Sequence, residues 1–285
     1  MFEETATARR RIVIDSFPES VVRYSGSHAV VCIDVLTAST TLVTSLSETR
    51  PTFIAPSRAA AIQIAAGLTG HAGQAGQASQ ARPILAGEAA GRPSEILQGF
   101  ELLDSPSALA KVGANERPLV LHSSAACDLI SGAALEASET YVCGLRNLDA
   151  TARALASRSR NVAIIGAGYH SEFSCEDQFA CAHLAQRLLD LGYALGDPRS
   201  MEIVRRWSDA DLSFLAWGNS AAALRKAGRA EDVDFVLAHY DDLSFAARAR
   251  PRGEIAIEIP FEASVGSAQP PAALPDSSPS LKGAR

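Results

Sequence analysis

Short apolar runs alternate with helix-like segments along most of the chain. Residues 29–35 (AVVCIDV) form a nearly continuous apolar run, which is typical of a strand buried on both faces of a sheet. The pattern predicts further strands at residues 52–55, 119–122, 140–143 and 161–165, and helices at residues 39–47, 57–67, 124–134, 147–156 and 175–191. This alternation predicts an α/β fold with a mostly parallel sheet and helices on both faces.

The same pattern predicts one α/β domain over residues 1–262. Inside it, residues 68–81 (LTGHAGQAGQASQA) are rich in Gly, Gln and Ala, which predicts a mobile loop. Residues 198–260 are predicted to form a C-terminal helical subregion, and the alternating residues 254–259 (EIAIEI) predict an edge strand within it. The Pro- and Ser-rich residues 263–285 predict a disordered tail.

The charge balance and the apolar segments limit the partners. Among 285 residues, 26 are Lys or Arg and 32 are Asp or Glu, so the basic face of a large nucleic-acid footprint is not expected. No apolar run reaches the length of a membrane span, and the first residues lack the apolar stretch of a secretory signal. Five cysteines without CxxC spacing indicate a reducing compartment. We therefore expect a cytoplasmic protein with neither nucleic acid nor membrane as partner, and a homodimer stays open.

Candidate site residues follow the predicted strands, because ligands of parallel α/β sheets bind outside the carboxyl ends of the strands. Asp34 ends the first buried run, where an unpaired carboxylate is costly unless a metal or a basic group accompanies it. The turn that follows contains Thr37, Ser39 and Thr40, whose hydroxyls can cap a helix and donate to an anion. The alternative interpretation is a structural acid followed by an ordinary helix cap.

Two further strand ends carry polar residues. Glu88 follows a short apolar strand and a glycine, so it either faces the cleft or is a surface acid. His122 ends another predicted strand, and Ser123 and Ser124 open the next helix. Small residues at such a turn let backbone N–H groups approach an oxyanion. His122 is a candidate phosphate contact or proton donor, with a buried structural histidine as the alternative.

A glycine-rich loop, residues 166–174, links a strand to the helix that begins with Glu176 and Asp177. Acids in a first helical turn suit the helix dipole, so a structural explanation competes with a site. The loop contains Gly168 but no GxGxxG pattern, which argues against a dinucleotide site. Acids at several strand ends together with two helix N-termini suit phosphoryl chemistry with Mg²⁺.

Several phosphatase and hydrolase classes are excluded by their own motifs. A haloacid dehalogenase-like enzyme needs a second Asp two residues after the first, and that position holds Leu36. The chain contains neither a GxxxxGK[ST] loop nor a GxSxG elbow, and its CxxxxxR match at residues 181–187 lies within the helix predicted at residues 175–191 and not in a thiolate loop. These absences direct attention to metal-assisted hydrolysis by carboxylates.

Five segments in one order resemble the Mg²⁺-dependent 2-phosphosulfolactate phosphatase family. They are DVLTASTT (34–41), GE (87–88), GFELLDSP (99–106), HSSAA (122–126) and GAGYHSEFSCEDQFACA (166–182). The similar family segments are DVLRAS(T)T, GER, GFDLGNSP, TTNGT and CAG…FSLED…CAG. Together they span most of the chain, and an ordered set is far more specific than any single motif.

The resemblance implies the fold of that family and metal-assisted hydrolysis of a phosphate monoester of a small acid. By position it implies that Asp34, Glu88 and Asp177 bind Mg²⁺ or activate water, and that Ser39, Thr40, Ser123 and Ser124 contact the phosphate. To these the strand-end positions add His122 as a catalytic candidate and Thr37 and Gly168 as candidate substrate contacts.

The chain departs from the family segments at two arginines. The Arg of DVLRAS is Thr37 here and the Arg of GER is Ala89. Two lost guanidinium groups remove strong anion contacts, for which Arg92 and Arg146 are candidate replacements. The alternative function is therefore a catalytically impaired anion-binding or scaffold protein of the same fold.

Overall fold

The computed structural model describes residues 10–70, 82–89, 92–168, 172–253 and 255–263. Its strands are β1 (Arg11–Asp15), β2 (Ala29–Ile33), β3 (Thr52–Ile54), β4 (Ile84–Ala89), β5 (Arg92–Ile96), β6 (Leu119–His122), β7 (Glu139–Val142), β8 (Asn161–Gly166), β9 (Ala194–Leu195), β10 (Phe245–Arg252), β11 (Ala256–Glu258) and β12 (Phe261–Ala263). Most of the loop predicted at residues 68–81, and all but the first residue of the predicted tail, lie outside the described residues.

The described helices are α1 (Ala38–Ser47), α2 (Arg58–Gly70), α3 (Pro106–Val112), α4 (Ser124–Glu136), α5 (Leu148–Arg158), α6 (Cys175–Asp190), α7 (Pro198–Trp207), α8 (Asn219–Lys226) and α9 (Ala230–Ala238), with short 3₁₀ turns η1 (Pro18–Arg23), η3 (Leu145–Asn147) and η4 (Leu212–Trp217). Within the same residues no helix is long and apolar enough to cross a membrane.

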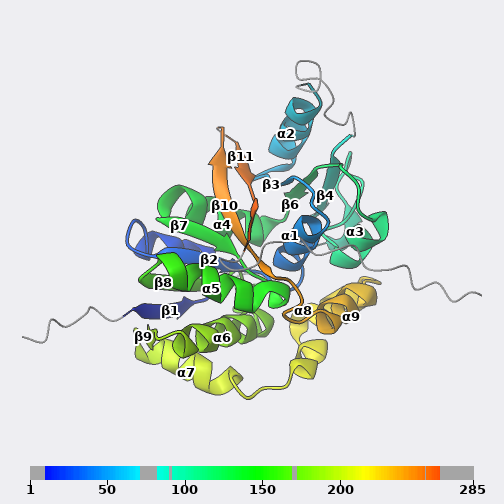
Figure 1. Ribbon diagram of the computed structural model, residues 1–285. Coiled ribbons are helices and arrows are strands. Elements are labelled where there is room, and N and C mark those ends of the chain that lie inside the picture. The colour runs from blue at the N-terminus through cyan, green and yellow to red at the C-terminus, as the bar shows by residue number, and fades with distance from the viewer. Residues whose placement is uncertain (1–9, 71–81, 90–91, 169–171, 254, 264–285) are drawn as a thin grey trace, which may run out of the picture.

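The described strands form one sheet in the order β5-β4-β6-β3-β11-β10-β7-β2-β8-β1-β9, with β12 beside β10. Helices cover both faces of this mostly parallel sheet (Figure 1), so the predicted α/β class is confirmed. Alternate residues of β2 explain the layers: Val31 and Ile33 pack among residues of α5 and α6, whereas Val30 and Cys32 pack among residues of α1 and α4. Burial on both faces is the reason for the continuous apolar run.

The sheet consists of two halves. The strands within each half are parallel to one another, and the strands of one half run opposite to those of the other. One half contains β9, β1, β8, β2 and β7, and the other contains β3, β6 and β4. They are joined by β10 and β11, which pair antiparallel with each other and with β7 and β3. Three antiparallel steps in succession reverse the second half relative to the first.

The predicted edge strand at residues 254–259 is wrong. The described strand there, β11, pairs with β10 on one side and with β3 on the other, so it lies inside the sheet. Ile257 is buried, whereas the partly exposed Glu258 pairs with Arg252 across the hairpin, at 2.8 Å between Oε1 and Nη1. Polar alternation thus reports the two different faces of a strand and does not show whether the strand lies at the edge of the sheet.

Candidate functional site

A cavity of about 570 Å³ opens where the carboxyl ends of strands from both halves meet. Its wall takes residues that directly follow β2, β8 and β6, together with the end of β4. Six acids line it: Glu19, Asp34, Glu88, Asp104, Asp128 and Asp177. Among the described lining residues, Arg92 is the one basic side chain. The cavity is thus strongly acidic.

Asp34 is the acid on which the other carboxylates converge. Burial, followed by the charges of Asp177, Asp104 and Glu88, raises the pKa of Asp34 well above its usual range. No Lys or Arg of the described chain forms an ion pair with the carboxylates of Asp34 or Asp104. The Asp34 carboxylate is therefore surrounded by like charges, and it is stabilised either by binding a cation or by taking up a proton.

The turn after β2 is held by the hydroxyls predicted as phosphate contacts. Ser39 Oγ accepts the backbone N–H of Asp34 at 2.8 Å, and Thr40 Oγ1 donates to the carbonyl of Val35 at 2.9 Å. Both side chains are buried and neither lines the cavity. Their hydroxyls are used by local backbone groups, a common alternative for Ser and Thr at a helix start, so the structure places them behind the site.

Asp177 enters the cavity wall from the first turn of α6. Ser174 caps this helix by accepting the N–H of Asp177 at 3.1 Å. The Asp177 carboxylate accepts the N–H of Val35 at 2.9 Å and that of Gly168 at 3.2 Å, which ties the turns after β2 and β8 together. Burial is the largest cause that raises the pKa of Asp177 to about 7, against the lowering effect of the Val35 hydrogen bond.

Two glycines, one at the end of β8 and one in the loop after it, are required by the close approach of other groups. A Cβ at residue 166 would lie 2.9 Å from the Asp177 Cβ, and one at residue 168 would lie 2.7 Å from the Glu172 carbonyl oxygen. Gly168 also has a φ of +72°, which side chains rarely adopt. Gly168 lines the cavity, as expected of a substrate-binding position.

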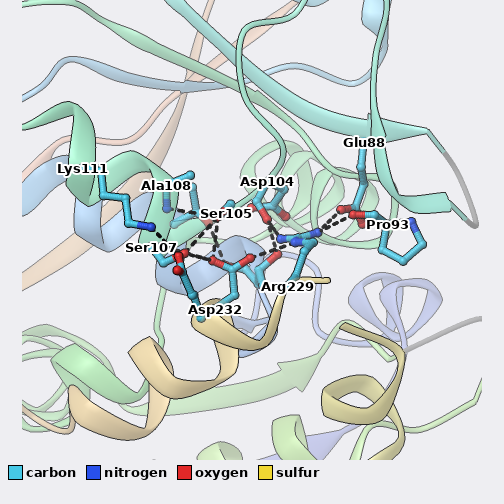
Figure 2. A network of polar contacts seen from close by, with 12 residues as sticks. Glu88, Pro93, Asp104, Ser105, Ser107, Ala108, Lys111, Arg229 and Asp232 are labelled. Carbon is cyan, nitrogen blue, oxygen red and sulfur yellow. Dashed lines mark hydrogen bonds and ion pairs between the residues drawn. The ribbon is translucent and has the colours of Figure 1, made fainter. Parts of the chain in front are cut away.

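Glu88 reaches the cavity from β4, in the other half of the sheet. Its Oε2 lies 2.6 Å from Nη1 of Arg229. Burial and the charge of Asp104 raise the pKa of Glu88 to about 7, although Arg229 acts in the lowering direction. Figure 2 shows Glu88, Arg229 and Asp104 in one polar network. Glu88 is therefore a cavity acid with a fixed cationic partner.

The remaining predicted residues divide between the cavity and its surroundings. Thr37, Ser123 and Ser124 line the cavity, and Thr37 Oγ1 donates to the carbonyl of Asp104 at 2.7 Å. Helix α4 begins beside the cavity and has no side-chain cap at Ser123, so N–H groups of its first turn are available to an anion.

The structure does not bring His122 to the cavity. Its Nδ1 lies 3.0 Å from the carbonyl oxygen of Ala55, and the residue is not among those that line the cavity. The predicted catalytic role of His122 therefore has no support in its position.

The predicted metal ligands share one cavity without forming a ready three-ligand site. No group of three His, Cys, Asp or Glu side chains in the described chain is arranged to hold an ion. Glu88 is paired with Arg229, and Asp177 accepts two backbone N–H groups. The buried Oδ1 of Asp104 has no hydrogen-bond partner among the described residues. Asp34 and Asp104 thus fit Mg²⁺, which commonly takes one or two carboxylates and completes its shell with water and phosphate.

Sequence reasoning missed Asp104 and Arg229 as site residues. Asp104 lies inside the family-like segment at residues 99–106 but follows no predicted strand, and Arg229 lies 141 positions after Glu88. The rule that ligands bind at the carboxyl ends of strands selects residues that follow strands, whereas Asp104 and Arg229 precede helices.

Comparisons with known proteins identify the family of the chain. A family model described as 2-phosphosulpholactate phosphatase matches residues 15–244. A probable 2-phosphosulfolactate phosphatase of Deinococcus radiodurans is 28% identical over 228 residues, covering 79% of this chain and 88% of that protein. One of Prochlorococcus marinus is 28% identical over 217 residues, covering 75% and 82%. The family match spans well over half of the chain and includes every acid that lines the cavity. The chain therefore belongs to the 2-phosphosulfolactate phosphatase family.

Proposed function

We propose that this protein is a Mg²⁺-dependent phosphatase that hydrolyses a phosphate monoester of a small acidic metabolite similar to 2-phosphosulfolactate. Membership of the family and the names of its relatives support the reaction class. The observation that carries the proposal is the excess of carboxylates around Asp34, together with the lack of an ion-pairing Lys or Arg on Asp34 or Asp104 among the residues that the structure describes.

This acid excess has a direct chemical consequence. A phosphate dianion would be repelled by the bare cavity, and the carboxylates would be costly to ionise without a cation. Asp34 and Asp104 would hold Mg²⁺, which, when bound, neutralises both partners and polarises the phosphoryl oxygen. The residues present thus fit a cation that binds together with its anionic substrate.

Residues of the chain itself would supply three further roles in the reaction. The first-turn N–H groups of α4, next to Ser124, would bind phosphate oxygens. The carboxyl of Glu88, with a pKa raised to about 7, would exchange a proton with water or the leaving oxygen near neutral pH. Asp177 would keep the turns after β2 and β8 in register with these groups.

The test is release of inorganic phosphate from a panel of phosphorylated small acids, including 2-phosphosulfolactate and a generic aryl phosphate. We expect release with Mg²⁺, loss of release with EDTA, and recovery when Mg²⁺ is restored. The exposed acid Glu202 lies on α7, away from the lining residues, so Glu202→Gln serves as a control with unchanged rates. Absence of release from every ester by a folded sample would contradict the proposal.

One observation favours an impaired anion-binding or scaffold protein as a second candidate. Arg92 lines the cavity but is exposed and paired with Glu95 at 2.6 Å, and Arg146 bonds Asp242 and Thr44 instead of lining the cavity. The two predicted replacements for the lost guanidinium groups are therefore weak or absent from the site. Binding of orthophosphate without turnover of any ester would favour this second candidate.

A further inference from the structure

Arg229 joins the start of α9 to the β4–β5 hairpin and to the segment before α3, which lie 125 to 141 positions earlier in the sequence. Its guanidinium donates to Glu88 Oε2 in β4 at 2.6 Å and to the carbonyl of Pro93 in β5 at 3.0 Å. It also donates to Asp232 Oδ2 in α9 at 2.8 Å and to the carbonyl of Asp104. Figure 2 shows the guanidinium between Glu88 on one side and Asp232 on the other. One side chain thus fixes the acidic wall of the cavity to the C-terminal helices.

The environment makes this guanidinium difficult to replace. Arg229 is 6% exposed and lies beside three acids, so it is the buried positive charge of this part of the molecule. A planar guanidinium can donate to several acceptors in fixed directions, whereas a lysine ammonium is a point charge. Removing the guanidinium would leave buried carboxylates without an opposite charge. This costs far more stability than breaking an exposed ion pair.

Arg229 does not touch the cavity, yet its partners do. The lining residues include Glu88, Pro93 and Asp104 but not Arg229. Its contacts with Glu88, Pro93 and Asp104 link it to the cavity wall. We therefore expect its effect on a ligand to pass through these lining residues.

The C-terminal helices are anchored at the same point. Asp232 accepts the hydroxyls of Ser105 and Ser107, each at 2.6 Å, from the start of α3. Thr37, on the opposite wall, donates to the same Asp104 carbonyl that accepts from Arg229. The turn after β2, the segment before α3 and α9 therefore meet at one carbonyl group.

We infer that Arg229 is a positioning residue of the active site, which holds the Glu88 carboxylate and the Asp104 segment in the geometry that the reaction requires. This inference rests on the proposed phosphatase function. It makes the α8–α9 region, which carries none of the family segments noted in the sequence, a functional part of the site.

The first test compares Arg229→Lys with Arg229→Gln in the full-length protein, with folding checked by circular dichroism. We expect kcat to fall by on the order of ten- to a hundred-fold in the Gln variant, the scale of a small misplacement of a reacting group. The Lys variant should recover part of this loss because it keeps the charge. The control Lys111→Gln breaks the ion pair with Glu231 at the exposed edge of the same α3–α9 contact and should keep the wild-type kcat.

The second test separates positioning from stability. In a Glu88→Gln background, Arg229→Lys should cost a smaller factor in kcat than in the wild type, because the Glu88 carboxylate is already gone and only the Asp104 segment is left to position. Its effect on the melting temperature should persist. Independent losses of kcat in the two variants, or a wild-type kcat in a folded Arg229→Lys or Arg229→Gln variant, would overturn the inference.

A third measurement keeps the inference testable if no ester is turned over. Calorimetry with orthophosphate and Mg²⁺ reports on the cavity without catalysis. If the wild type binds phosphate, Arg229→Lys should raise the Kd at least about fivefold while Lys111→Gln leaves it unchanged. Equal Kd values in wild type and Arg229→Lys would overturn the role of Arg229 even though the proposed function had failed separately.

A further variant serves if Arg229→Lys does not fold. Asp232→Asn removes one anchor of the guanidinium and leaves its contact with Glu88, so it should show a smaller loss in the same assays. Wild-type values would overturn the inference.

Discussion

The carboxyl of Asp177 should make the metal-free protein less stable as the pH rises. The side chain is 3% exposed and accepts two backbone hydrogen bonds, and burial raises its pKa to about 7. A folded carboxyl that keeps its proton more tightly than the unfolded chain contributes full stability at acid pH. That contribution is lost as the pH rises from about 4 through about 7.

The size of the effect follows from the difference in pKa. An unfolded Asp titrates near 3.9, and each pKa unit corresponds to about 1.4 kcal/mol, so the loss is on the order of 4 kcal/mol. This is a large part of the roughly 5–15 kcal/mol that stabilises an ordinary domain. Asp177→Asn has nearly the same shape and cannot ionise. The amide NH2 of the variant would face one of the two backbone N–H donors that the carboxylate accepts, which costs a roughly constant amount at every pH. The stability of the variant should therefore change little between pH 4 and pH 8, while that of the wild type falls.

The assay is equilibrium unfolding in urea with EDTA, at several pH values between 4 and 8, with linear extrapolation to water. The control is Asp190→Asn, the same substitution at an exposed position on the same helix, which should run parallel to the wild type. Parallel profiles for Asp177→Asn and the wild type would refute the reasoning, because they would show that Asp177 ionises in the folded protein at no cost.

Three further predictions concern the cavity. Asp34→Asn should keep the circular dichroism spectrum and lower the rate of phosphate release by at least about a hundredfold, the scale of one positioned catalytic group; an unchanged rate would remove Asp34 from the site. Gly168→Ala should lower the free energy of unfolding in urea by about 1–3 kcal/mol, because its φ is positive and the new Cβ would meet the Glu172 carbonyl; wild-type stability would contradict this. Mg²⁺ should raise the melting temperature more at pH 8 than at pH 5, because ionised carboxylates bind a cation more tightly than protonated ones, and equal shifts would contradict the proposed metal site.

The strand-end rule found the principal acids because their placement is local. Asp34 directly follows β2, and Asp177 lies in the first turn after a loop, so backbone geometry alone puts them near the sheet edge. The direction of nearby hydroxyls is not fixed in the same way. The hydroxyls of Ser39 and Thr40 could bond either an anion or backbone groups of their own turn, and in the structure they bond the turn. Residue type at a helix start therefore predicts capping chemistry better than it predicts ligand contact.

The features missed by sequence depend on contacts between distant segments. β10 reads FAARARPR, too polar and too rich in arginine for a recognisable strand, and it forms only because β7 and β11 supply hydrogen bonds and acidic partners. Arg229 likewise has no local pattern that distinguishes it from a surface arginine. Its burial results from α9 docking against α3 and β4, and tertiary contacts of this kind are invisible to periodicity.

The reversal of the sheet places the family segments in two different halves. Asp34 and the loop after β8 belong to one parallel half, whereas Glu88 and Ser123 belong to the other. Neither half alone contains both sides of the cavity, so the acids can act together only after β10 and β11 have joined the two halves. The β10–β11 hairpin thus assembles groups that earlier parts of the sequence supply. A disturbance of that hairpin should therefore reach the site by separating its walls, even though no residue of β10 or β11 lines the cavity.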